Sequence, residues 1–181
     1  MKPLVERHGN WSIAVSDVDP SAVFDAIESR REVAEAESSA SDQLEVSVCV
    51  EVLQFGGGLT PRALLGGTFV SGGSEFVIEV GSSGSMTLGA SRECQSLLGG
   101  PLVRGLPLEF VEPVLEGLAG IARGVEQPAG TLRIHAAGYD EENSSPHAFR
   151  HAGAAMLWLV NKQILTSGEP VDGLAEIAAM W

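Results

Sequence analysis

The sequence is poor in basic residues and in long apolar runs. Only 11 Lys and Arg stand against 24 Asp and Glu in 181 residues, which gives a formal net charge of −13. Because nucleic-acid backbones are bound mainly through Lys and Arg, this balance disfavours free nucleic acid as a partner. No apolar run approaches the roughly 18 to 20 residues that a membrane-spanning helix needs, and residues 1–8 lack the apolar segment of a secretory signal. These absences predict a cytoplasmic protein that does not bind membranes.

Cysteine and nucleotide-binding motifs are equally scarce. Cys49 and Cys94 form neither a Cys-x-x-Cys pair nor a disulfide framework, so we expect two reduced thiols. The Gly-x-x-x-x-Gly-Lys-Ser/Thr motif is absent from the sequence, which excludes a P-loop GTPase domain. The glycines at 56–58 and 81–84 precede no helix start with a lysine, so they predict flexible loops instead of phosphate cradles.

Apolar residues make up 44% of the chain, enough to fill the core of one domain. The clearest pattern is the alternation of apolar and polar residues over 44–52, which predicts a strand with one buried face. Its other face carries Glu45, Ser47, Cys49 and Glu51. That face could be a ligand surface, but the plainer expectation is that it is solvated or contacts the N-terminal segment. Further strands are predicted at 67–70, 75–80 and 131–136, with a polar turn over 138–143.

Two amphipathic helices are predicted in the second half of the chain. The first covers residues 107–123, although Pro113 would delay the regular helix to about that position. Ser145 and Pro146 are suited to be the N-cap and first residue of the second, which runs to about residue 165. Its apolar side is formed by Phe149, Gly153, Met156 and Val160. A short helix closes the chain.

The small polar segment 37–43 is the best candidate for a boundary. Before it, residues 11–15 predict a short strand, and Asp19 and Pro20 predict a helix start. The apolar side of this helix would be formed by Val23, Phe24 and Ile27. We therefore predict an N-terminal appendage over 1–36 and a main domain over 37–181. The order of the elements predicts an α+β sandwich with helices on one face of a sheet.

Two segments of the main domain carry a family pattern. The first is Leu98-Gly99-Gly100-Pro101 and the helix candidate after it, over residues 108–118. The second is Tyr139 followed by Asn-Ser-Ser-Pro-His-Ala-Phe-Arg over 143–150. Together they resemble domain IV of translation elongation factor G and the related domain of tetracycline-resistance ribosomal protection proteins. In that family a Gly-Gly turn precedes a helix, and a Ser-Ser-x-x-Ala-Phe-Lys pattern follows the tip turn.

The resemblance extends over residues 44 to about 160 and implies a two-layer sandwich with a left-handed β-α-β crossover. It also implies a tip made of two loops, 38–43 and 138–145, which in elongation factor G reaches the decoding site beside transfer RNA. The tip residues carried over as ligand-binding are Tyr139, Asn143 and Ser144. The sequence departs from the family at both loops, since Ser39-Ala40-Ser41-Asp42 replaces glycines in the first. In the second, carboxylates that would repel a phosphate backbone are present, namely Asp140, Glu141 and Glu142.

Three histidines, His135, His147 and His151, fall within 17 residues. His147 and His151 are four apart on a predicted helix, so their rings can face the same direction. They could bind a divalent metal such as Zn²⁺ with a third ligand, or all three could act in acid–base catalysis. The plainer interpretation is that they are surface or half-buried side chains near a turn.

Two arginines lie close to these histidines in the sequence. Arg133 and Arg150 could hold an anionic ligand beside the histidines. The alternative is that they form ion pairs with the carboxylates of residues 140–142.

Several functional hypotheses therefore stand side by side. The first is a stand-alone elongation factor G domain IV-like binding module without GTPase activity, acting on the ribosome or another translation component. The second is an enzyme or small-ligand-binding protein that reuses this fold with a His-rich site at 135–151. The third is a protein–protein adaptor or a homo-oligomer that pairs through its sheet. No cofactor is predicted beyond a divalent metal under the second hypothesis.

Overall fold

A computed structural model describes residues 3–36, 44–85, 93–166 and 174–178. Within these residues, nine strands form one sheet with the order β1-β2-β4-β5-β9-β6-β3, and β8 pairs with both β9 and the short β7. Only β6 and β9 are parallel among the described pairs. The strands are β1 (Leu4–His8), β2 (Trp11–Ser16), β3 (Glu28–Glu35), β4 (Glu45–Gln54), β5 (Arg62–Ser71), β6 (Glu75–Ser82), β7 (Glu93–Cys94), β8 (Leu102–Arg104) and β9 (Gly130–Tyr139).

Two helices, α1 (Leu108–Ala122) and α2 (Pro146–Leu165), pack side by side on one face of the sheet. A short helix, α3 (Leu174–Ala178), lies against β1 and β2. The chain is thus an α+β protein in which a nine-stranded, mostly antiparallel sheet carries two helices on one face, as the order of predicted elements indicated.

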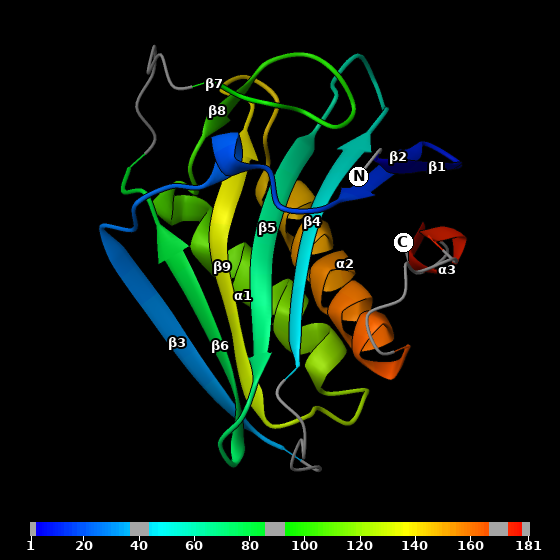
Figure 1. Cartoon of the computed structure of the whole chain (residues 1–181). Helices are drawn as coiled ribbons and strands as arrows, with labels where there is room; N and C mark the ends of the chain where they lie inside the picture. The colour runs from blue at the N-terminus through cyan, green and yellow to red at the C-terminus, as the bar shows by residue number, and fades with distance from the viewer. Residues whose placement is uncertain (1–2, 37–43, 86–92, 167–173, 179–181) are drawn as a thin grey trace.

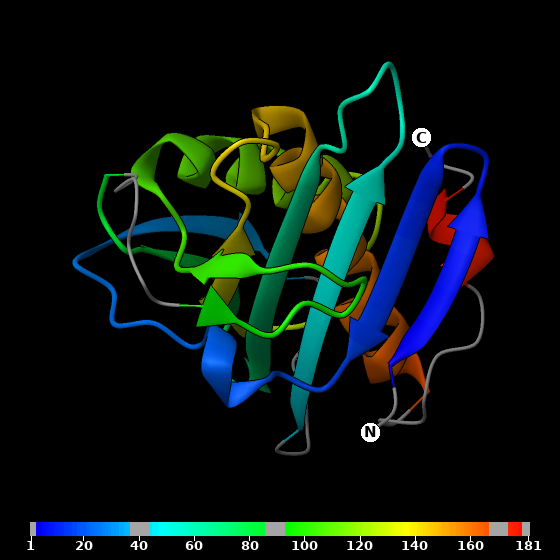
Figure 2. The ribbon, with the colours of Figure 1, turned by 90° about the horizontal axis from the view of Figure 1, so that it is seen from above.

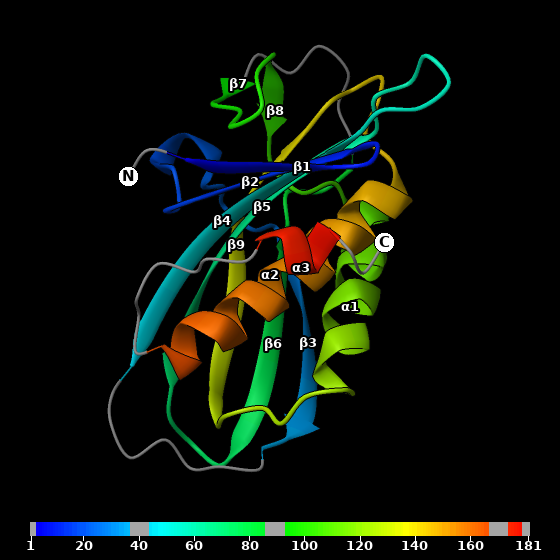
Figure 3. The ribbon, with the colours of Figure 1, turned by 90° about the vertical axis from the view of Figure 1, so that its right-hand side faces the viewer.

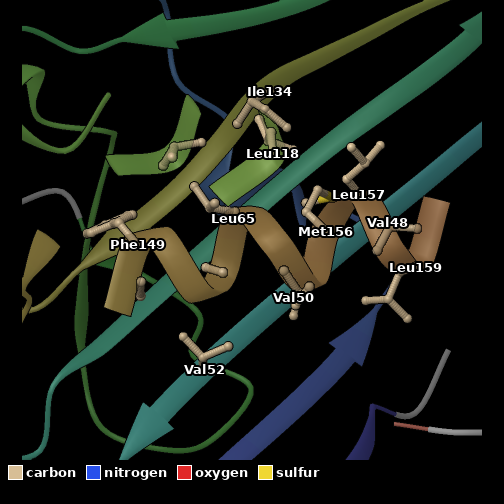
Figure 4. Packing of buried hydrophobic residues seen from close by; sticks show 14 of the residues in the cluster. Val48, Val50, Val52, Leu65, Leu118, Ile134, Phe149, Met156, Leu157 and Leu159 are labelled. Carbon is tan, nitrogen blue, oxygen red and sulfur yellow. The ribbon is translucent and has the colours of Figure 1, made fainter. Parts of the chain in front are cut away.

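The hydrophobic core lies between the sheet and the two helices. The alternating valines of β4 point toward α2 and are buried, which confirms the strongest strand prediction. From α2, the predicted apolar residues all enter this core, and Ser145 caps the helix by accepting a hydrogen bond from the Ala148 N–H. Figure 4 shows the side chains of Val48, Val50, Met156 and Leu159 in this layer. The alternation of β4 and the apolar stripe of α2 therefore meet at one interface.

Glycines let α1 and α2 approach closely. A Cβ atom added to Gly117 of α1 would overlap the carbonyl oxygen of Arg150, and one on Gly153 of α2 would lie 2.5 Å from that of Val114. Helix α1 also begins at Leu108, earlier than predicted, and contains Pro113 in its interior. The missing N–H removes one helical hydrogen bond, but the Pro113 ring is buried and contributes to packing. The delayed start predicted for this helix is therefore wrong.

Among the described residues, one end of the outer face of the sheet, away from the helices, is covered. Figure 2 shows the segment between β7 and β8 crossing over β5 and β4 on this side. It buries Glu51 beneath it, while Cys49 packs against Ala22 from the N-terminal segment. Glu45 and Ser47, at the other end of β4, are exposed. This face is therefore exposed to solvent at the Glu45 end of β4, and it contacts the N-terminal segment at Cys49.

Residues 4–35 add three strands to the same sheet. The predicted strand is β2, and Asp19 does act as an N-cap, because its carboxylate accepts a 2.6 Å hydrogen bond from the Ser21 N–H. The helix it begins is a single 3-10 turn, η1 (Pro20–Ala22). The longer helix carrying Val23, Phe24 and Ile27 is a wrong prediction, since β3 follows and pairs with β6. The predicted boundary at 37–43 lies outside the described residues.

Candidate binding tip

One end of the sheet gathers the loops that carry most of the candidate residues. The β4–β5 loop, residues 55–61, lies beside the turn that joins β9 to α2, residues 140–145, because Leu64 of β5 pairs with Gly138 of β9. The Ser144 hydroxyl donates a 2.7 Å hydrogen bond to the carbonyl oxygen of Arg62. The Phe55 N–H donates to the Asn10 carbonyl in the β1–β2 turn. We call these two loops, 55–61 and 140–145, the tip.

The tip differs from the one implied by the family resemblance. Residues 38–43, expected as its first loop, lie outside the described residues. Their described neighbour Glu45 pairs with Val70, which in turn pairs with Thr131 near the start of β9. Tyr139, which leads into the second loop, ends β9 at the opposite end of the sheet. The glycine-rich loop that does lie beside residues 140–145 is 55–61, which contains Gly56, Gly57 and Gly58.

The second tip loop is held by its own polar side chains. The Asp140 carboxylate accepts hydrogen bonds from the backbone N–H groups of Glu142 (2.9 Å) and Asn143 (3.0 Å). Ser144 accepts a 2.8 Å bond from the Asp140 N–H in addition to its bond to Arg62. Tyr139 is buried in the core and, with Gly138, belongs to β9. Tyr139, Asn143 and Ser144 were the three residues predicted to bind a ligand here. In the structure all three make contacts that hold the fold together.

The two arginines form ion pairs, but not with the acids of residues 140–142. Arg133 Nε lies 2.9 Å from the Glu79 carboxylate on the neighbouring strand β6. Arg150 Nε lies 2.8 Å from Glu116 and so bridges α2 to α1. The alternative pairing predicted for Arg133 and Arg150 is therefore wrong, because sheet register and helix packing bring other carboxylates closer.

The three histidines do not converge. His147 and His151 lie on the first two turns of α2 with their Nε2 atoms 3.0 Å apart. His135 lies instead on the outer face of the sheet, in a shallow pocket on the side away from the helices, and its Nδ1 is 3.2 Å from the Arg133 carbonyl oxygen. In the part of the chain that the structure describes, no three His, Cys, Asp or Glu residues come together as a metal cluster. A site that uses all three histidines has no geometric support.

The His147–His151 pair packs against an aromatic ring. The indole of Trp11 lies 4.7 Å from the His151 ring and 5.8 Å from the His147 ring, centroid to centroid. Burial, followed by the neighbouring His147 and Arg150, lowers the pKa of His151 to about 4. His151 is therefore neutral at neutral pH, whereas the His147 ring lies on the exposed side of the helix.

A buried ion pair between Glu51 of β4 and Arg62 of β5, which the sequence did not predict, lies next to the tip. Arg62 Nη2 donates to Glu51 Oε1 at 2.5 Å, and both side chains are almost fully buried. Glu51 Oε2 also accepts the backbone N–H groups of Leu97 (2.5 Å) and Leu98 (3.1 Å). This network fixes the segment between β7 and β8 onto the sheet. Its signals in the sequence were a glutamate in a strand and an arginine after a loop, which are too common to be diagnostic.

Both cysteines are buried free thiols on the covered part of the outer face. Burial is the main cause that raises the pKa of Cys49 to about 12 and the pKa of Cys94 to about 11. Because the thiolate is the nucleophilic form, neither residue is suited to covalent catalysis. The prediction of two unpaired thiols is confirmed.

The exposed surface of the tip is apolar and acidic. Phe55 is 47% exposed and Leu59 is 62% exposed, although both are large apolar side chains. Glu142 is exposed on the second loop. Residues 55–61 and 140–145 include no Lys, Arg or His. A partner would therefore meet apolar side chains bordered by negative charge.

Comparisons with models of protein families, with curated proteins and with solved structures found no match to this chain. Among the described helices, none is long and apolar enough to cross a membrane. The geometry of the tip and of the fold thus carries the functional conclusion.

Proposed function

We propose that this chain is a stand-alone binding module of the elongation factor G domain IV type, without GTPase activity, that binds its partner through the tip. The partner is the ribosome or another component of translation. One observation carries the proposal: the glycine-rich loop 55–61 and the turn 140–145 lie side by side at one end of the sheet. In the family that the sequence resembles, the acting part is also a tip of two loops, although the resemblance implies residues 38–43 as the first of them where we propose residues 55–61.

We also infer that the β6–α1–β9 unit is a left-handed crossover, as in that family. Support comes from the parallel pairing of β6 and β9 and from the position of α1 behind the sheet in Figure 1. In that view both strands point upward and β9 lies to the right of β6. A right-handed unit, the usual form, would have its helix in front of the sheet in this orientation.

The burial and pairing of the chemically reactive side chains favour a binding role over an enzymatic one. Cys49 and Cys94 are buried, and Glu51 and Arg62 are buried and engaged with each other. His135 lies on a different face of the sheet from the other two candidate histidines. No described constellation combines a nucleophile, a base and an accessible cavity, so the His-rich catalytic site is the weaker hypothesis.

The chemistry of the tip indicates what kind of surface it meets. Phe55 and Leu59 are exposed, and removing their apolar surface from water would stabilise a complex with a partner. Glu142 and Glu141 favour basic side chains around that contact and oppose a bare phosphate backbone or a second acidic copy of this chain. We therefore propose that the tip binds a basic protein surface, such as a protein component of the ribosome, and not RNA or another copy of itself.

Co-sedimentation with ribosomes tests this proposal at about 50 mM and about 200 mM salt, a range over which phosphate contacts weaken strongly. The tip variant Phe55→Ser with Leu59→Ser should lose at least tenfold in affinity. A matched control changes two apolar residues outside the tip that are even more exposed, Ile27→Ser with Leu165→Ser, and should bind like the unmodified protein. Absence of binding at the lower salt would contradict the proposal that the partner is the ribosome. An equal loss of affinity in both variants would show that the tip is not the binding surface.

A further inference from the structure

We propose that His147 and His151 form a two-histidine site for a divalent transition metal ion, with Cu²⁺ as the preferred ion. The site lies on the first two turns of α2, with His147 exposed and His151 half-buried, next to the tip but separate from its two loops. It extends beyond the binding role proposed above and does not depend on it.

The two ring nitrogens are within hydrogen-bond distance, so one Nε2–H donates to the other Nε2, and a metal ion that replaces this proton would be shared by both rings. Their Nε2 atoms are 3.0 Å apart, and the two ring planes are nearly perpendicular at 87°. Metal–imidazole bonds of about 2.0–2.1 Å drawn from nitrogens at this separation meet at about 95°. A tetrahedral angle would need about 3.3 Å between the nitrogens. A small rotation of the exposed His147 ring covers the difference between these two separations, so the pair can bind one ion at either angle. The preference for Cu²⁺ follows from the order of affinities of imidazole sites for divalent metal ions.

The pair is also held in place before any ion arrives. Both histidines project from one helix, whose start is fixed by the Ser145 cap and by the buried Phe149 ring. The Trp11 indole packs against both imidazoles and restricts their rotation. Ligands that are already oriented lose less conformational entropy when the metal binds.

Two protein ligands define the class of site. Across the described residues no third His, Cys, Asp or Glu joins the pair, so water or a donor from a partner would complete the coordination sphere. This is an open site and not a closed structural one of four protein ligands. The order of affinity expected from ligand type places Cu²⁺ above both Ni²⁺ and Zn²⁺.

Trp11 provides a direct readout, because Cu²⁺ bound to His151 would lie close to the indole and quench its emission. Tag-free protein is titrated with CuCl₂ and followed by tryptophan fluorescence and by calorimetry. We expect one equivalent to bind, and His147→Ala and His151→Ala each to weaken binding at least tenfold. His135→Ala, on the other face of the sheet, is the matched control and should bind as tightly as the unmodified protein.

Circular dichroism melts show whether each variant is folded, and the exposed position of His147 makes its variant the safer of the two. Trp11→Phe should keep the calorimetric affinity within a few-fold and lose the larger part of the fluorescence change. Equal affinity in the His147→Ala, His151→Ala and His135→Ala proteins would overturn the site, as would the absence of Cu²⁺ binding to the unmodified chain.

Discussion

The Ser144 hydroxyl and the Arg62 carbonyl oxygen, 82 positions apart in the sequence, are joined by a 2.7 Å hydrogen bond. Through this bond the turn after β9 is attached to the first residue of β5, and so the second tip loop is attached to the strand that follows the first. The same hydroxyl accepts from the Asp140 N–H at 2.8 Å. One small side chain therefore links the turn to β5 in addition to the strand pairing that places the two loops side by side.

Replacing this hydroxyl should loosen the tip without unfolding the protein. Ser144→Ala removes both hydrogen bonds and should lower the free energy of unfolding by about 2 kcal/mol. Urea denaturation measures the loss. Ser74→Ala, at an exposed serine in the β5–β6 turn, should leave the unfolding midpoint unchanged. Equal midpoints for the Ser144→Ala and Ser74→Ala proteins would contradict the role given to Ser144.

Removing the charge of Glu51 should destabilise the protein strongly. Glu51→Gln leaves the buried Arg62 guanidinium without its counter-ion, and breaking a buried pair on one side costs about 3–5 kcal/mol. Glu45→Gln is the matched control, since Glu45 lies on the same face of the same strand but is exposed, and its unfolding free energy should stay within about 0.5 kcal/mol of the unmodified value. A similar small effect for both substitutions would show that the pair does not fix the covering segment.

Two glycines in α1 should respond in opposite directions to the same substitution. Gly117→Ala would force the added methyl against the backbone of α2 and should destabilise by about 2 kcal/mol or more. Gly120→Ala adds its methyl to open space on the exposed side of the helix and should stabilise by up to about 1 kcal/mol. Thermal melts of the two variants compare them directly. Stabilisation by Gly117→Ala would rule out the close approach of α1 and α2.

The thiols should be unreactive and should make the protein less stable at high pH. Burial raises the pKa of Cys49 from 9.0 to about 12 and that of Cys94 to about 11. The unfolded chain therefore loses these protons first, and the contribution to stability is full below pH 9 and falls as pH rises toward those values. A thiol reagent at pH 8 should label the unfolded chain only.

Urea midpoints at pH 8 and pH 10.5 test the same point. The unmodified protein should lose more stability between these values than the double variant Cys49→Ala with Cys94→Ala. Rapid labelling of the folded protein, or equal pH dependence in both proteins, would show that the thiols are accessible.

Sequence patterns predicted the helices and strands whose apolar residues face the core. They did not predict strands whose conformation depends on pairing with a distant strand. The alternation in β4 and the Ser145–Pro146 start of α2 are local signals, and both are confirmed. Strand β3, with its charged sequence and a burial pattern that is almost wholly exposed, has no such signal. Its backbone pairing with β6 determines its conformation. An edge strand rich in charge is also a recognised way to discourage unwanted strand pairing.

The candidate site was predictable only in its local parts. A spacing of four places His147 and His151 together because both lie on one helix. Nothing local reveals that His135 points to the other face of the sheet, since this depends on the register of β9 and its irregularity beside Gly66 and Gly67. The place of loop 55–61 beside residues 140–145 was unpredictable for the same reason, because it depends on the register of β5 and β9.

In the proposed function residues 55–61 meet the partner, and the inert native thiols allow this contact to be measured directly. A photo-cross-linker attached to the single accessible thiol of the Leu59→Cys variant should capture a ribosomal protein or another translation component. The same reagent on the Leu165→Cys variant, at a more exposed position on the far end of α2, should capture none. Capture of the same protein from both positions, or from position 165 alone, would contradict the account.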